Sequence, residues 1–273
     1  MRESFLNAAK VLVQSGKDEE ALEMAANIWR LWVSARDIPG GRKFLSIVLD
    51  GTKRRPSRNR TLALYGDGLL SLKEGKLEDS EKRNQEALEI AKEVRDSEAL
   101  VLANLGLSRI AFEDSDYEHA RVLATKALEL TRGLDPALAQ APLHAQGQSN
   151  RMLGDYDAAA GLLTKSLELN RRIGDTGMVI VELQNLGHVE AHRGNFDIAE
   201  RLFNESRSLE SSDDPYSAAM IELNEAVIAY GKKDFQHARK LLTNCMSTLE
   251  KSGIDAAQDD RFEIDFLDQK LRE

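Results

Sequence analysis

The chain has 273 residues and a net charge of −9; 30% of its residues are charged, 5% are aromatic and five are proline, a composition that favours helix over sheet. An acidic chain without a basic stripe is a poor candidate for direct nucleic-acid binding, and the single cysteine, Cys245, excludes a disulfide framework within one chain. No apolar run approaches the ~18 residues of a membrane span, and the N-terminal segment lacks a signal-peptide core, so we expect a soluble, cytoplasmic protein without membrane contact.

A first helix is predicted near residues 2–14, and a repeated unit follows it. A column of large apolar residues recurs at spacings of 39, 40, 39, 40 and 39 residues, and a column of small residues follows it three positions later. The columns are Ile38, Leu77, Tyr117, Tyr156, Phe196 and Phe235, and Gly41, Ser80, Ala120, Ala159, Ala199 and Ala238. Two columns that stay in phase through six units predict an all-α solenoid of stacked helix pairs.

Each unit is expected to hold two helices joined by a tight turn. Helix N-cap residues precede the apolar column in five units, as Asp37, Asp116, Asp155, Asn195 and Asp234, and glycines that favour the left-handed conformation precede three of the N-cap positions, as Gly75, Gly154 and Gly194. One solenoid domain is predicted over residues 1–273, with helix pairs near 18–52, 57–96, 97–133, 135–174, 175–212 and 214–252.

A capping helix is expected at residues 255–272. The polar outer face that a terminal cap needs would come from Asp259, Asp260, Glu263 and Asp268. Two connecting segments also carry expectations. The basic residues Lys53, Arg54, Arg55, Arg58 and Arg60 are interpreted as a solvated linker, and Ser211–Pro215 as a turn with a helix N-cap rather than a calcium loop.

The repeated motifs resemble the tetratricopeptide repeat (TPR). They are Asn104-Leu105-Gly106 and Asn185-Leu186-Gly187 in first helices, Gly154-Asp155-Tyr156 at a turn, and Ala87-Leu88-Glu89 and Ala127-Leu128-Glu129 in second helices. The usual unit has about 34 residues, so the resemblance here is to long-unit variants such as kinesin light chain. Residues 25–32 and 40–45 resemble the beginning of the TPR sensor domain of bacterial LuxR-type regulators and signal-transduction ATPases. The phosphate-loop and helix-turn-helix signatures of those regulators are absent from this sequence.

The resemblance implies that the first helices line a concave groove that binds a protein or peptide. In similar adaptors an asparagine two residues before the small glycine contacts the peptide backbone; here the alternative is that these asparagines only tether helices. Cationic and polar residues gather in the fourth and fifth units, which suits an acidic partner segment. The candidate groove residues are Asn27, Arg30, Tyr65, Asn104, His144, Gln148, Arg151, Gln184, Asn185, His188, Asn224 and Tyr230.

The histidines of the fifth unit could suggest a metal site. His188 and His192 are four residues apart on one helix, and His144 is expected on a neighbouring first helix. However, no carboxylate joins this face at an obvious position, so we interpret them as groove histidines and expect no metal and no cofactor. No motif for nucleophilic catalysis or phosphate binding is present.

The sequence therefore predicts a non-catalytic protein- or peptide-binding module with a regulatory or scaffolding role in a bacterial cell. The alternative is an effector-sensing domain of a transcription regulator or signalling ATPase; a helical-repeat phosphatase is the weakest reading. Trp29, Trp32 and Phe44 either seal the core at one end or form a homodimer interface.

Overall fold

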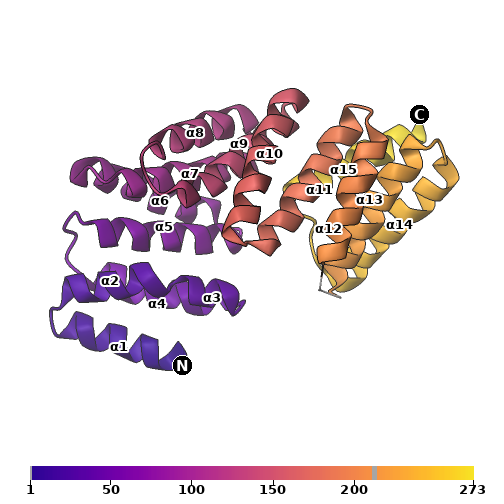
Figure 1. The fold of residues 1–273 in the computed structure, drawn as a ribbon. Coiled ribbons are helices and arrows are strands. Elements are labelled where there is room, and N and C mark those ends of the chain that lie inside the picture. The colour runs from indigo at the N-terminus through magenta and orange to yellow at the C-terminus, as the bar shows by residue number, and fades with distance from the viewer. Residues whose placement is uncertain (1, 211–213) are drawn as a thin grey trace. The chain divides into compact units, whose positions relative to one another are not determined.

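The computed structural model describes residues 2–210 and 214–273, and every regular element within them is helical (Figure 1). Contacts divide the chain into two compact units, Met1–Ala145 and Gln146–Glu273, here called unit 1 and unit 2. Helix α9 (Gln140–Met152) contributes its first residues to unit 1 and residues 146–152 to unit 2. None of the described helices is both long and apolar enough to cross a membrane.

Unit 1 contains the leading helix and the first three helix pairs. Its elements are α1 (Arg2–Gln14), α2 (Asp18–Ile28), α3 (Arg30–Ser34), α4 (Ile38–Gly51), α5 (Arg58–Lys73), α6 (Leu77–Val94), α7 (Ser97–Glu113), α8 (Tyr117–Leu130) and the short 3-10 helix η1 (Pro136–Ala139). Unit 2 continues from the end of α9. Its elements are α10 (Tyr156–Ile173), α11 (Thr176–His192), α12 (Phe196–Leu209), α13 (Pro215–Gly231), α14 (Phe235–Ser252) and α15 (Gln258–Arg272).

The observed helices match the predicted pairs closely, with two differences. The first helix of the first pair bends at Trp29, where the backbone tightens to a hydrogen bond from Trp32 N to Trp29 O, and it is thereby divided into α2 and α3. The fourth pair opens with the 3-10 helix η1, which Asp135 caps by accepting from Ala137 N, and continues as the α-helix α9.

The turn within each helix pair uses the expected chemistry, and also residues that the sequence analysis did not recognise. Gly75, Gly154 and Gly194 adopt φ of 71°, 78° and 80°, as predicted. The same position in the other three units is occupied by Arg36, Ser115 and Lys233, with φ of 53°, 62° and 63°. A side chain with a Cβ atom is disfavoured there, so the packing of the helices, and not the local sequence, imposes the turn in these units.

Four of the five predicted N-caps are confirmed. Asp37, Asp116, Asp155 and Asp234 each accept a hydrogen bond from the backbone N–H three residues later. Asn195 also occupies the N-cap position of α12, but its side chain forms no capping hydrogen bond, and its Nδ2 donates to Glu190 Oε2 at 2.7 Å. Residues 211–213 of the predicted turn lie outside the described residues. Asp214 caps α13 by accepting from Tyr216 N and Ser217 N.

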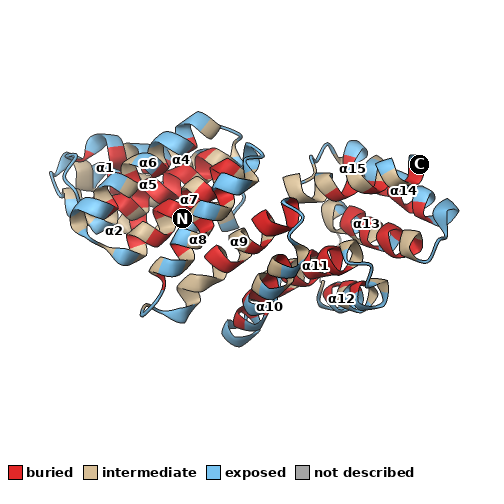
Figure 2. Ribbon diagram, turned by 90° about the horizontal axis from the view of Figure 1, so that it is seen from above, coloured by how far each residue is buried: buried red, intermediate tan, exposed pale blue. Residues whose placement is uncertain are grey.

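The small-residue columns mark the seams between helices, as the sequence predicted. All six members of the second column are buried. Glycines of the first helices allow close approach: a Cβ atom on Gly68 or Gly106 would lie 2.3 or 1.9 Å from the Asn84 side chain, and one on Gly187 would lie 2.3 Å from Phe203. Figure 2 shows the resulting buried strips along the packed helices within each unit.

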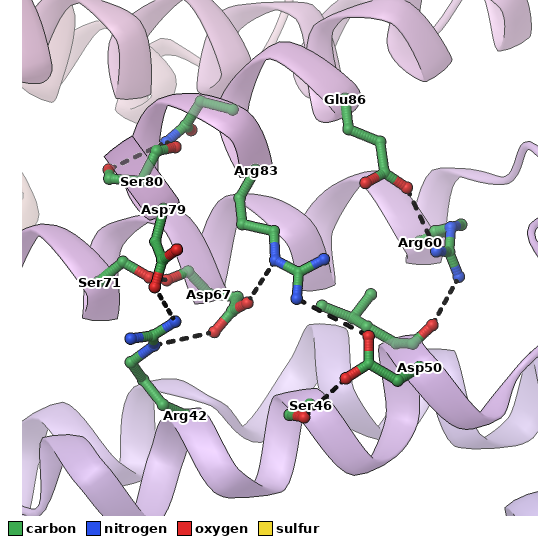
Figure 3. A network of polar contacts seen from close by, with 12 residues as sticks. Arg42, Ser46, Asp50, Arg60, Asp67, Ser71, Asp79, Ser80, Arg83 and Glu86 are labelled. Atoms are coloured by element: carbon green, nitrogen blue, oxygen red, sulfur yellow. Dashed lines mark hydrogen bonds and ion pairs between the residues drawn. The ribbon is translucent and has the colours of Figure 1, made fainter. Parts of the chain in front are cut away.

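Unit 1 also contains a buried ion-pair network that joins its first two helix pairs (Figure 3). Asp67 of α5 is 1% exposed, and its carboxylate lies 2.8 Å from Arg83 Nε of α6 and 3.5 Å from Arg42 Nε of α4. Burial raises the pKa of Asp67, and the two arginines oppose that shift. Because both arginines compensate a carboxylate inside the stack, we assign the network a structural role.

The predicted solvated linker is only partly solvated. Lys53, Arg54 and Arg55 are exposed, but Arg60 is 2% exposed and pairs with Glu86 at 3.2 Å while donating to Leu49 O. Arg58 pairs with Asp96 at 2.6 Å. The interpretation as a solvated linker is therefore wrong for Arg60, whereas the Arg58 side chain is 45% exposed at the start of α5.

Candidate functional site

In unit 2 the C-terminal helix α15 lies against side chains of the first helices α9, α11 and α13. We call the contacted surface the first-helix face; it consists of Gln148, Arg151, His188, His192 and Tyr216. We call the residues of α15 that meet it most closely the acidic turn; these are Asp259, Asp260 and Glu263. The contacts are polar and occur mostly between buried groups.

Two carboxylates of the acidic turn meet the cationic part of the face. Asp259 Oδ2 accepts from Gln148 Nε2 at 2.9 Å and lies 3.2 Å from an Arg151 guanidinium nitrogen. Glu263 Oε1 lies 3.5 Å from Arg151, and its Oε2 lies 2.9 Å from His192 Nε2. The Arg151 and Glu263 side chains are 1% and 3% exposed, so these charges interact with little screening by water.

The third carboxylate meets α13. Asp260 Oδ2 accepts a hydrogen bond of 2.5 Å from the Tyr216 hydroxyl, and that hydroxyl oxygen accepts from Ala257 N at 3.0 Å. Tyr216 thus holds both the first turn of α15 and the residue that precedes the helix.

Aromatic rings complete the contact. The imidazole of His192 stacks on Tyr156, with centroids 4.7 Å apart and planes 5° apart, and meets the edge of Phe266 at 4.6 Å. Phe262 lies 6.1 Å from the same imidazole. Ile264, Leu267 and Leu271 of α15 join the apolar core of the last helix pair, and Leu267 also lines the cavity beside His192 and Phe266. The helix therefore has an apolar stripe with acidic and aromatic side chains adjoining it.

Burial and charge set the protonation of this cluster. Burial alone would raise the pKa of Glu263, but His188, His192 and Arg151 outweigh it and lower that pKa to about 2. Burial lowers the pKa of His188 to about 4, against the attraction of Glu263. Burial and the neighbouring Asp259 raise the pKa of Asp260 to about 7. At neutral pH the face therefore holds a Glu263 carboxylate beside the Arg151 guanidinium and a neutral His188.

Several expectations about unit 2 are corrected by these contacts. Arg151 and His188 were expected to face an open groove, yet they are 1% and 3% exposed beneath α15. The acidic turn was expected to form the polar outer face of the cap, but Glu263 is buried and Asp259 is largely covered. A carboxylate does join the two histidines, since Glu263 reaches them from α15, although Arg151 beside it disfavours a bound cation. No group of ligands placed to hold a metal ion occurs among the described residues.

The other predicted residues of unit 2 line two separate pockets, except Asn185, which is buried. Tyr230 lines a cavity of about 250 Å³ that also includes His192, Glu263 and Phe266. Gln184 and Asn224 line a separate crevice of about 270 Å³ beside α12. Asn185 is buried; its Nδ2 donates to Val181 O, and its Oδ1 has no hydrogen-bond partner among the described residues.

The predicted residues of unit 1 do not converge on a single cluster. Asn27 is exposed, and Arg30 is exposed with its guanidinium 4.5 Å from the Trp29 ring. Tyr65 is buried and accepts from Arg109 at 2.7 Å. Asn104 is fully buried and bonds within its own helix to Leu100 O. His144 is half-buried on α9.

Two of the buried asparagines, Asn104 and Asn185, share one arrangement. Each amide nitrogen bonds to the carbonyl four residues earlier in its own helix, so neither forms the predicted tether between helices through that nitrogen. Both Oδ1 atoms lack a hydrogen-bond partner within the described residues. A role in binding a peptide backbone stays a prediction.

The sequence analysis missed Tyr216, Phe262 and Phe266 as parts of this site. One signal was available: α15 carries two phenylalanines four residues apart beside three carboxylates, which is more than a polar cap requires.

No family model matches the chain, and no curated protein matches it. Solved structures do match its fold. Cut9, in the APC/C hetero-tetramer Cut9-Hcn1, has a TM-score of 0.68 and 14% identity over 98% of this chain, which spans 46% of that one. A Rap protein complexed with competence and sporulation factor has a TM-score of 0.65 and 14% identity, covering 93% of this chain and 76% of that one.

The TPR-like repeats of a kinesin light chain from Podosopora anserina are also similar. They have a TM-score of 0.55 and 13% identity, covering 69% of this chain and 93% of that one. At these identities the likeness shows the fold alone. The chain has the fold of a TPR-like helical solenoid, as the sequence predicted.

Proposed function

We propose that this protein is a non-catalytic module that binds a protein or peptide through the first helices of its repeats. The observation that supports this most directly is the docking of α15, because the first-helix face of unit 2 holds a helical segment by buried, charge-assisted contacts. The similar Rap structure, which is complexed with competence and sporulation factor, agrees with such a role. The chemistry of the face favours an acidic partner.

The proposal is tested by affinity capture with the full chain as bait, followed by mass spectrometry. One variant changes unit 1 at exposed positions, Asn27→Ala with Arg30→Glu, and a second changes unit 2, Arg151→Glu with Asn185→Ala. Arg171→Glu, an exposed position on α10, is the matched control. The proposal is supported if a partner is recovered with the wild type and the control but is lost with at least one of the two first-helix variants, provided that this variant keeps its helicity. Equal recovery with every variant contradicts it.

A sensing role in a transcription regulator or signalling ATPase is the second candidate. It is favoured by the N-terminal resemblance and by a first-helix face that its own helix covers, since a covered face suits a response to an effector. An ATPase or DNA-binding segment in the same polypeptide would support this role. Capture of partner proteins that include no transcription regulator and no signalling ATPase would count against this role.

A further inference from the structure

The acidic turn of α15 and the first-helix face have the character of a ligand and its receptor. Three carboxylates meet Arg151, His192 and Tyr216 at 2.5 to 3.5 Å, and Phe266 lies against the His192 imidazole. A cap that serves only to cover apolar ends needs a leucine stripe. Helix α15 has that stripe in Ile264, Leu267 and Leu271, which join the core of the last helix pair. The polar contacts are additional to the capping function.

The fit between the two is incomplete. Arg151 is 1% exposed and its terminal guanidinium nitrogens lie 3.2 and 3.5 Å from two carboxylates, yet its Nε has no hydrogen-bond acceptor among the described residues. A cavity of about 250 Å³ remains between α15 and the helices beneath it, lined by His192, Val227, Tyr230, Phe266 and Leu267 among others. An unsatisfied buried donor costs roughly 1–3 kcal/mol, and unfilled apolar volume forfeits packing contacts. A segment that filled this space and satisfied Arg151 would bind the face better, residue for residue, than α15 does.

The connection to α14 would allow exchange. Helix α14 ends at Ser252 and α15 begins at Gln258, and three residues of the short connection, Gly253, Ile254 and Asp255, are exposed. A tether this short keeps α15 at a local concentration on the order of millimolar. A competing segment must overcome that advantage, so the resting protein keeps the face covered.

We propose that the first-helix face of unit 2 is a receptor for an acidic, aromatic helix of a partner protein, and that α15 is its intramolecular occupant. The partner segment carries carboxylates at the positions of Asp259 and Glu263, a hydrogen-bond acceptor for Tyr216 at the position of Asp260, and aromatic residues at the positions of Phe262 and Phe266. It binds by replacing the acidic turn at Arg151, His192 and Tyr216. This inference rests on the proposed function, and it names the partner chemistry and the surface.

The test uses a fluorescent synthetic peptide with the sequence of residues 256–273 and the full-length protein. Fluorescence anisotropy compares the wild type with a loosened variant, Asp259→Asn with Glu263→Gln, in which the acidic turn is neutral and the first-helix face is intact. We expect the loosened variant to bind the peptide at least ~10-fold more tightly than the wild type does, because its own helix competes less. Adding Arg151→Ala to the loosened variant should abolish the gain.

The controls match these changes in charge. Asp265→Asn removes a carboxylate from the exposed side of α15 and should leave binding as in the wild type. A peptide with amides at the positions of Asp259, Asp260 and Glu263 should not bind the loosened variant. If the double variant loses helicity by circular dichroism, Asp259→Asn alone replaces it, because the Asp259 side chain is 16% exposed and its removal disturbs the core least.

Three results would overturn the inference: no gain of peptide binding in the loosened variant, a gain that survives Arg151→Ala, or dimerisation of the loosened variant in place of peptide binding. The last would mean that the face serves only a second copy of the chain. The proposed function is separable from this test. Partners captured by the full chain together with no peptide binding would remove this inference alone, whereas absence of both would remove the proposed function as well.

Discussion

Replacement of Asp260 by asparagine should stabilise the protein, and should do so more strongly at alkaline pH. The carboxylate accepts a hydrogen bond from Tyr216, but burial and the neighbouring Asp259 raise its pKa to about 7 from an ordinary value of 3.8. Above pH 7 the folded state must therefore hold a charge that it disfavours. Asparagine keeps an oxygen that can accept from Tyr216 and carries no charge.

The sign and size of the stabilisation by Asp260→Asn follow from proton linkage. Between pH 4 and pH 7 the folded protein retains a proton on Asp260 that the unfolded chain releases. The contribution of Asp260 to the free energy of unfolding therefore becomes more favourable as the pH falls and less favourable as the pH rises. At 1.36 kcal/mol per pKa unit, the raised pKa costs about 4 kcal/mol at pH 8, where the folded state holds the disfavoured charge, and about 2 kcal/mol at pH 5, where folding must take up a proton. Asp260→Asn should recover these amounts.

The assay is urea unfolding followed by far-UV circular dichroism at both pH values, with linear extrapolation to water. Asp265→Asn, on the exposed side of the same helix, is the control and should change the free energy of unfolding by less than ~0.5 kcal/mol at either pH. A stabilisation by Asp260→Asn that is equal at pH 5 and pH 8, or a loss of stability at pH 8, would refute the reasoning.

Three further predictions concern stability. Lys233→Gly should increase the free energy of unfolding by ~1 kcal/mol and so raise the melting temperature, because it relieves the strain of a lysine that holds φ of 63° at a turn. An unchanged or lower melting temperature would contradict the assigned strain. Ala199→Leu should destabilise by roughly 1–3 kcal/mol in urea, because the Ala199 side chain is fully buried at a helix seam; a neutral effect would mean that the seam is loose. Arg151→Met should cost roughly 3–5 kcal/mol at pH 7, since it leaves Glu263 buried without its guanidinium, whereas Arg171→Met on the surface should cost little.

The fold could be predicted from the sequence because its determinants are local and repeated. Small residues such as Ala159 and Ala199 must recur wherever helices pack closely, and capping residues such as Asp155 act on backbone groups three residues away. Because each helix pair needs these residues at the same places, they recur in the sequence every 39 or 40 residues. The turns at Arg36, Ser115 and Lys233 were hidden, because helix packing imposes a left-handed residue there without a glycine to mark it.

The site could be predicted only in part, because it depends on contacts between distant segments. Sequence analysis identified Gln148, Arg151 and His188 as chemically notable, and the structure does bring them together. Nothing local to them indicates that residues more than 70 positions later cover them: Gln148 bonds to Asp259, 111 residues away, and His192 bonds to Glu263, 71 residues away. The carboxylates of α15 were assigned to the outer face for the same reason, since a polar cap and an acidic ligand have similar composition.

Hydrogen–deuterium exchange of the full chain, with and without Glu263→Gln, tests most directly whether α15 is a separable occupant of the first-helix face. We expect the α15 amides to be protected in the wild type and to exchange much faster in the variant, while α13 and α14 keep their protection. Loss of protection in α13, α14 and α15 together would contradict this expectation, because α15 would then be an inseparable part of the core.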